Sequence, residues 1–315
     1  KIISFPGYFF NFSGRIYMGK KNCTTYTVTS EHQGLTLEQY LKTILNIPGR
    51  KLQKLTRIKG ILINNKPSFL KKSLKSSDII SLKIIQDQNF GVTPQLGAIS
   101  ILYEDDNLIV LNKPPFQLVH PTAHTTENTL ANFLANYFKE NNLTIKIRPL
   151  HRLDRDTSGC IIFAKSDKSQ TLYTKQLQEK TLKRKYLALT LGKIPQDCGT
   201  INQPISKDPL SPNRRIINEN GEIAITNYKI IQRFNNDYNL IELALETGRT
   251  HQIRVHLKHL NCPIVGDNMY GKKSTLINRQ ALHAHSISFI DIDSNEEKII
   301  IAPLPVDIKN TIEKI

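Results

Sequence analysis

Residues 151–159 read HRLDRDTSG, and the apolar run CIIF follows at residues 160–163. These nine residues carry two carboxylates, two guanidiniums, an imidazole and two hydroxyls, with no helical or strand periodicity. Charged side chains at this density are rarely found in a core, whereas the apolar run predicts a buried strand. A charged loop at the end of a strand is a usual place for a functional site. Composition alone leaves one alternative open, a solvated loop held by salt bridges.

The sequence on either side of this stretch predicts strands and helices that do not alternate regularly. Strands are expected at residues 99–103, 108–111, 160–164, 184–191, 224–231, 239–245 and 283–290, and helices at 129–138, 169–180 and 250–258. The irregular order disfavours a doubly wound parallel sheet. We therefore expect an α+β fold for residues 99–315, with a mixed, mainly antiparallel sheet flanked by helices.

A small α/β unit is predicted at residues 23–85. Thr36 can cap a first helix, and a second helix is expected from about residue 50 to residue 59, with Ile58 on its inward apolar stripe. Short strands are expected at residues 23–33, 61–63 and 78–84. The two units together predict a two-domain chain.

Two segments fall outside these units. Residues 1–22 are expected to form an irregular leader. Residues 86–98 are polar, contain Gly91, Pro94 and Gly97, and are expected to form a linker.

The charge balance points to a polyanionic partner. Lys and Arg number 43 against 27 Asp and Glu, which gives a formal net charge of +16. Nucleic acid is the commonest such partner. An anionic membrane surface is the rival reading, but neither a basic amphipathic helix nor a lipid anchor is found, and no apolar run is long enough to span a bilayer.

The four cysteines lie far apart in sequence, without the paired spacing of a zinc site. A chain of this length does not need a disulfide scaffold, so free thiols in a reducing cytoplasm are the simpler reading. We expect a cytoplasmic monomer.

The basic residues concentrate in the small unit. Residues 50–75 contain nine basic residues and no acidic ones. Because like charges repel at helical spacing, an ordinary solvated face usually mixes both signs. We interpret the second helix as a phosphate-binding surface, a solvated face being the alternative. The candidate RNA-binding residues are Arg50, Lys51, Lys54, Arg57 and Lys59.

This segment resembles a known RNA-binding domain. The residues GRK at 49–51, KG at 59–60 and ILINNK at 61–66 are similar to the small domain named after ribosomal protein S-four. That family usually has Gly where this chain has Asn65. Asn also tolerates the left-handed turn, so the departure is mild.

The larger unit carries a second resemblance. HRLD at 151–154 with TSG at 157–159 closely resembles the signature of the RluA-type pseudouridine synthases, the group that includes RluC and RluD. Further segments match in order: NKP at 112–114 with VHP at 119–121, KY at 185–186, TGRTHQIRVH at 247–256, GD at 266–267 with YG at 270–271, and LHAH at 282–285. One departure is Phe116, where the family often has Gly, and it affects a turn rather than the chemistry.

The resemblance implies an enzyme that isomerises uridine to pseudouridine in RNA without a cofactor, with Asp154 as its catalytic carboxylate. A carboxylate in a dry pocket needs a cationic partner to stay ionised. The resemblance suggests Arg249 for this role, a surface phosphate clamp being the alternative. Tyr186 would stack on uracil rather than serve only as a core tyrosine.

The target nucleotide must leave its helix to be reached. The resemblance implies that Arg152 fills the gap, and a structural salt bridge with Asp156 is the alternative. Asp156 is the rival carboxylate of a glycosidase-like pair, but we interpret it as structural. His151 is expected to orient the site, and a metal site built on His251, His256 and His259 is disfavoured.

Relatives with the extra N-terminal domain mostly act on large-subunit ribosomal RNA, so 23S-type RNA or its precursor is the expected partner. A non-catalytic RNA-binding assembly factor is the main alternative function. An RNA N-glycosidase, which would release free uracil, is a weaker one.

Overall fold

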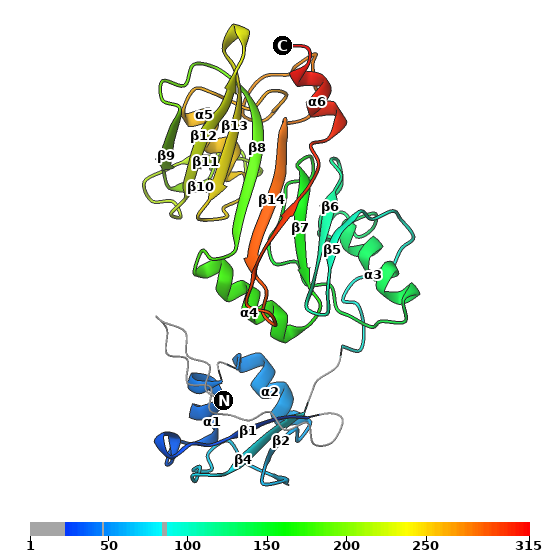
Figure 1. Cartoon of the computed structure of the whole chain (residues 1–315), viewed down its shortest axis with the longest axis vertical. Helices are drawn as coiled ribbons and strands as arrows, with labels where there is room; N and C mark the ends of the chain where they lie inside the picture. Colours follow the sequence, from blue (N-terminus) through cyan, green and yellow to red (C-terminus); the bar gives the residue numbers. More distant parts are fainter. Residues whose placement is uncertain (1–22, 46, 84–86) are drawn as a thin grey trace. The chain divides into compact units, whose positions relative to one another are not determined.

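The computed structural model describes residues 23–45, 47–83 and 87–315, which divide into two compact units with the boundary after Gln86 (Figure 1). The leader expected at residues 1–22 lies outside the described residues. Within the described ranges, no helix is both long and apolar enough to cross a membrane.

The smaller unit is a four-stranded antiparallel sheet with helices, in strand order β1-β4-β2-β3. Its strands are β1 (Cys23–Thr27), β2 (Ile61–Ile63), β3 (Lys66–Pro67) and β4 (Ile79–Lys83). Its helices are a 3-10 turn (Ser30–His32), α1 (Leu37–Gln39), a π-helical turn that continues α1 (Tyr40–Ile44), and α2 (Gly49–Arg57).

Local chemistry explains the ends of these elements. Thr36 begins α1 through a capping box with Gln39, as its expected capping role requires. Asn65 has a φ of 65°, so it occupies the left-handed turn for which the family usually uses Gly. One expectation was wrong: Ile58 lies just after α2 and is 41% exposed, because the helix ends at Arg57 before the apolar stripe reaches it.

The larger unit is built on one nine-stranded sheet, confirming the mixed, mainly antiparallel α+β fold. The strand order is β5-β6-β7-β14-β8-β13-β12-β9, with β15 paired to β14. The strands are β5 (Ile101–Glu104), β6 (Leu108–Lys113), β7 (Ser158–Ala164), β8 (Lys183–Leu191), β9 (Cys198–Asn202), β12 (Ile225–Arg233), β13 (Tyr238–Leu245), β14 (Leu282–Ile290) and β15 (Glu297–Ile301). A separate hairpin pairs β10 (Ile205–Lys207) with β11 (Arg215–Ile217).

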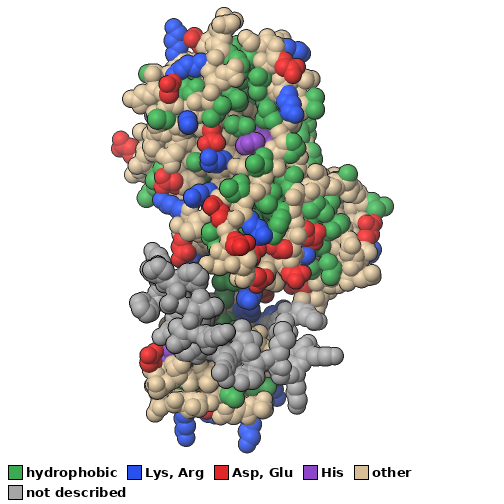
Figure 2. Space-filling view, viewed as in Figure 1, with side chains coloured by type: hydrophobic (Ala, Val, Ile, Leu, Met, Phe, Trp, Pro, Cys, Tyr) green, Lys and Arg blue, Asp and Glu red, His purple; other side chains and the backbone are tan. Residues whose placement is uncertain are grey.

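The helices of this unit are α3 (Leu130–Glu140), α4 (Asp167–Gln178), α5 (Gln252–His259) and α6 (Val306–Ile312), with a 3-10 turn at Asn235–Asp237. In Figure 1, α3 lies beside β5 and β6, whereas α4 lies at the end of β7. Acidic and basic side chains are interspersed over the face of this unit that Figure 2 shows. The hairpin, β9, β15 and α6 were not anticipated from the sequence.

The segment expected to be a linker is held against the larger unit. Asp87 accepts hydrogen bonds from Arg148 at 2.6 and 2.7 Å. Phe90 and Val92 pack against the main core. Residues 87–98 therefore follow the surface of the larger unit instead of spanning a gap, so the linker interpretation was wrong for them.

One parallel strand pair interrupts the otherwise antiparallel sheet. Strands β7 and β14 pair in parallel through Ser158 with His283 and Gly159 with Ala284. Gly159 has a φ of 108°, and a Cβ there would lie 2.2 Å from the carbonyl oxygen of Ala284. Only glycine fits this approach, which explains the Gly of the TSG segment.

The side chain of His283, on β14, also contacts β7. The hydroxyl of Ser158 lies 2.9 Å from Nδ1 of His283, and Nε2 lies 3.3 Å from the carbonyl of Ala302. A neutral imidazole satisfies both contacts, with Nε2–H donating and Nδ1 accepting. Burial lowers the pKa of His283 to about 4.

The lowered pKa of His283 predicts that the folded state loses stability in acid. Above pH 6.5 His283 is neutral in both states, but between about pH 6.5 and 4 only the unfolded chain binds the proton, so stability is lost as pH falls. We expect His283→Gln to reduce the loss in unfolding free energy between pH 7 and 4.5 by about 2 kcal/mol. Urea unfolding at pH 7 and at pH 4.5 measures this loss. His124→Gln, at an exposed position, should leave the loss unchanged.

Candidate active site

The loop before β7 is held by its backbone carbonyls. Lys113 is completely buried at the end of β6, and its Nζ donates to the carbonyl of Arg155 at 2.8 Å. Arg279 donates to the carbonyl of Asp156 at 3.0 Å, and the amide of Thr157 donates to that of Asp154 at 3.1 Å. Three successive carbonyls are thus bound, so the position of Asp154 is fixed before any ligand arrives.

Asp154 forms its ion pair with Arg254, not with Arg249. The Nη1 of Arg254 lies 3.1 Å from Oδ2 of Asp154. Arg249 instead pairs with Glu222 at 2.5 Å, donates to the carbonyl of Ile223 at 3.1 Å, and is 40% exposed in its side chain. The pairing expected for Arg249 was wrong, because Arg249 precedes α5 and turns outward whereas Arg254 lies within the helix and turns inward.

A second carboxylate holds Arg254 from behind. Asp267 is completely buried and accepts from Nε and Nη2 of Arg254 at 2.7 and 2.8 Å, a bidentate pair. Burial alone would lower the pKa of Arg254, but the hydrogen bond and charge of Asp267, together with Asp154, raise it above its usual value. The guanidinium therefore stays charged, 5.0 Å above the ring of Tyr270.

His251 completes this end of the site. Its Nε2 lies 3.9 Å from Oδ2 of Asp154, and its Nδ1 lies 2.9 Å from the hydroxyl of Tyr270. The residue caps α5 with a φ of 57°, an uncommon conformation for a side chain other than Gly or Asn. Burial lowers the pKa of His251 although Asp154 opposes the shift. The imidazole can orient Asp154 without adding a permanent charge.

Of the three histidines considered above for a metal site, His256 has both ring nitrogens in hydrogen bonds. His256 is buried, with Nδ1 at 2.8 Å from the hydroxyl of Thr226 and Nε2 at 3.0 Å from the carbonyl of Gln203. Both of its nitrogens are therefore occupied. In the ranges that the structure describes, no group of three or more His, Cys, Asp or Glu side chains is arranged to hold a metal ion.

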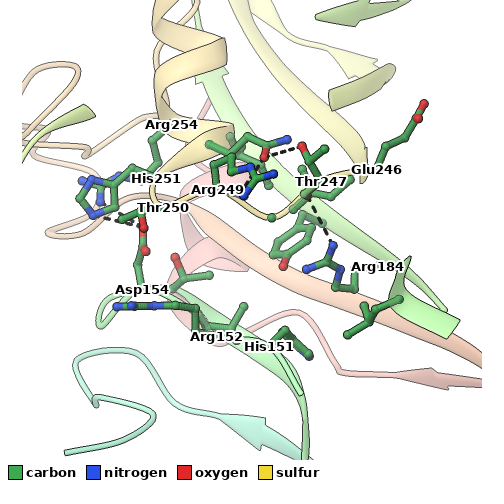
Figure 3. A pocket seen from close by; sticks show the side chains of 18 of the residues that line it. His151, Arg152, Asp154, Arg184, Glu246, Thr247, Arg249, Thr250, His251 and Arg254 are labelled. Atoms are coloured by element: carbon green, nitrogen blue, oxygen red, sulfur yellow. Dashed lines mark hydrogen bonds and ion pairs between the residues drawn. The ribbon is translucent and has the colours of Figure 1, made fainter. Parts of the chain in front are cut away.

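Asp154 opens into a cleft of about 390 Å³ (Figure 3). The cleft is lined by the loop before β7, by β8, by residues 245–251 and by the last turns of α4. Tyr186 lies on β8 within this lining and is 4% exposed. Burial raises the pKa of Tyr186, so its phenol is neutral at ordinary pH. The structure thus brings Asp154 and Tyr186 to one cavity of nucleoside size.

The other charged or ionisable residues of the loop differ in exposure and in their partners. Arg152 is exposed at the cleft and makes no ion pair with a described residue, so the salt bridge considered between it and Asp156 does not form. Asp156 pairs with Arg155 at 2.7 Å and does not line the cleft, which agrees with a structural role. His151 lines the cleft, and burial together with Arg184 lowers its pKa to about 3, so it is neutral at ordinary pH.

Comparison with known proteins decides the family. A model of RNA pseudouridylate synthases matches residues 107–259. The RNA pseudouridine synthase YhcT of Bacillus subtilis is 38% identical over 284 residues, which cover 90% of this chain and 94% of that protein. The chain belongs to the RNA pseudouridylate synthase family. It is an RluA-type synthase, an isomerase that converts uridine to pseudouridine in RNA.

Two further relatives agree with this assignment. Ribosomal large subunit pseudouridine synthase D of Neisseria meningitidis serogroup B is 35% identical over 297 residues, covering 90% of this synthase and 79% of that protein. The solved structure of human RNA pseudouridylate synthase domain containing 1 has a TM-score of 0.54 at 25% identity, covering 66% of this chain and 86% of that one.

Three charged residues of the site, Arg254, Asp267 and Arg184, were not predicted from the sequence of this synthase. All three lie inside or beside matched motifs, but a motif does not say which of its charged side chains turns inward. One signal was available for Arg254. It lies three residues after His251, and residues at this spacing share a helix face.

The geometry predicts that Arg254 matters more than Arg249 for the reaction. Arg254→Gln should lower the single-turnover rate of pseudouridine formation by about 100-fold or more, because Asp154 and buried Asp267 lose their shared cation. Arg249→Gln removes the same charge from an exposed ion pair and should lower it less than about tenfold. Comparable losses in the two variants, with folding verified by circular dichroism, would contradict this assignment.

Proposed function

We propose that this synthase modifies large-subunit ribosomal RNA, with Asp154 as its catalytic carboxylate and Tyr186 as the stacking platform for uracil. The observation that carries the proposal is the ion pair of Asp154 with Arg254 in a cleft that Tyr186 also lines. The guanidinium of Arg254 places a positive charge 3.1 Å from the carboxylate of Asp154.

The reaction needs only rearrangement of bonds within the nucleotide. The bond from N1 of uracil to C1′ of ribose breaks, C5 bonds to C1′, and the hydrogen on C5 is lost while N1 gains a proton. Nothing is oxidised or reduced. An ionised Asp154 can act as nucleophile or stabilise positive charge that develops at the sugar. The cleft, with Tyr186 in its lining, would keep the detached base in place.

Two observations support the RNA substrate. Several relatives carry the name ribosomal large subunit pseudouridine synthase D, with 31–36% identity and 78–95% of their own length covered. In the smaller unit, Lys54, Arg57 and Lys59 are exposed, Lys51 is half-buried, and none forms an ion pair with a described residue. The side chain of Arg50 is outside the described part. Unpaired cations on α2 and just after its end suit a phosphate backbone.

Asp154→Asn tests the catalytic assignment. We expect wild type to release tritium from RNA labelled at C5 of uridine and to form pseudouridine, and the isosteric variant to show neither above background, because the amide cannot act as an ionised carboxylate. Free uracil would indicate an N-glycosidase. RNA binding without release by wild type would indicate a non-catalytic factor. Equal rates for both proteins would remove Asp154 from the chemistry.

The smaller unit should contribute electrostatic binding. Replacing Lys51, Lys54, Arg57 and Lys59 with Gln in the full chain should weaken RNA binding and reduce the slope of log affinity on log salt, by up to about 0.9 per lost phosphate contact. The matched control replaces four exposed lysines of the larger unit, Lys139, Lys193, Lys309 and Lys314. If the slope falls equally in both variants, Lys51, Lys54, Arg57 and Lys59 do not form a specific binding surface.

A further inference from the structure

Arg184 places a cation in the cleft, away from Asp154. It lies on β8 two residues before Tyr186, so the two side chains share one face of the strand with about 6.6 Å between their Cα atoms. Both line the cleft. In Figure 3, Asp154 and Arg184 lie on opposite sides of the cavity. The sequence analysis assigned no role to Arg184.

The charge of Arg184 is not neutralised by any described residue. Its guanidinium makes one long hydrogen bond, from Nη2 to the carbonyl of Thr247 at 3.4 Å, and its buried Nε has no hydrogen-bond partner among the described residues. Glu246 lines the same cleft, but its two oxygens are taken by Lys180 and Asn227. A half-buried guanidinium without a counterion is costly. An anionic oxygen of a ligand would relieve that cost.

The surroundings leave room for such a ligand. At Gly248 an added Cβ would lie 3.0 Å from Nη1 of Arg184, so the absence of a side chain keeps that nitrogen free of crowding. His151 adds no competing charge because it is neutral. Thr174 and Gln178, one turn apart on α4, line the same cleft with uncharged hydrogen-bonding groups.

We propose that Arg184 binds a backbone phosphate of the RNA strand that carries the target uridine. A guanidinium offers only donors, in a fork that matches two phosphate oxygens. The pairing edge of uracil fits it poorly, since the N3–H donor lies between the O2 and O4 acceptors. The inference rests on the proposed function, because it assumes that the target strand enters the cleft beside Asp154.

The test uses a synthetic RNA hairpin that wild type converts, with one phosphate at a time replaced by a neutral methylphosphonate on either side of the target uridine. For wild type we expect one linkage whose replacement weakens binding about 10- to 100-fold, the range for a charge-assisted hydrogen bond. Arg184→Gln should weaken binding of the natural hairpin by a similar factor. That variant should then be insensitive to replacement at the same linkage.

Lys183→Gln is the matched control. It removes the same charge from the neighbouring exposed residue, which points to the other face of β8, and it should keep the wild-type sensitivity. Arg184→Lys retains the charge but not the forked guanidinium, so replacement of the same linkage should still weaken its binding, but by a smaller factor. This variant tests the inference if Arg184→Gln does not fold. If folded Arg184 variants respond to every linkage as wild type does, the inference is overturned. If wild type forms no pseudouridine in any RNA, the proposed function has failed instead.

Discussion

The guanidinium of Arg254 is shared between two carboxylates, and the active site depends on this arrangement. Asp267 takes two of its N–H groups in a fully buried pair, and its Oδ1 also accepts from the amides of Met269 and Tyr270 at 3.0 and 3.1 Å. The remaining contact goes to Asp154. Asp267 is fully buried, whereas Asp154 is 20% exposed, so Asp154 is the carboxylate of the pair that a ligand in the cleft can reach.

The scaffold keeps Asp154 in place by binding the backbone of its loop rather than its side chains. Lys113 and Arg279 hold the carbonyls that follow Asp154, and the close contact of Gly159 with Ala284 seats the same loop on the sheet. Dipoles and charges that are already positioned stabilise a transition state without reorganising during the reaction. The HRLDRDTSG stretch therefore combines the proposed catalytic carboxylate, Asp154, with the anchoring points of its own loop.

The sequence allowed most of the local structure to be predicted, because caps, turns and apolar periodicity act over a few residues. Thr36, Thr129 and the left-handed Asn65 behave as their types suggest, whereas Phe116 adopts a left-handed φ of 64° that Gly would favour. The hairpin of β10 and β11 has short strands and little apolar alternation, so it escaped notice. In the site, Asp154 and Tyr186 meet in one cleft, but choosing Arg254 over Arg249 requires knowing that α5 turns one of them toward Asp267, a contact between residues of different motifs.

The two charged positions of the cleft must be kept apart for either to work. If the guanidinium of Arg184 reached Asp154, it would compete with Arg254 and add a second cation beside one carboxylate. The fold prevents this, because Arg184 lies on β8 whereas Asp154 lies in the loop before β7, and the two side chains lie on opposite sides of the cavity in Figure 3. The anionic side can then face the sugar while the cationic side remains open to an anion. The two-residue repeat of β8 places Arg184 and Tyr186, the proposed phosphate contact and the proposed platform for uracil, on one face of the strand, and both line the cleft.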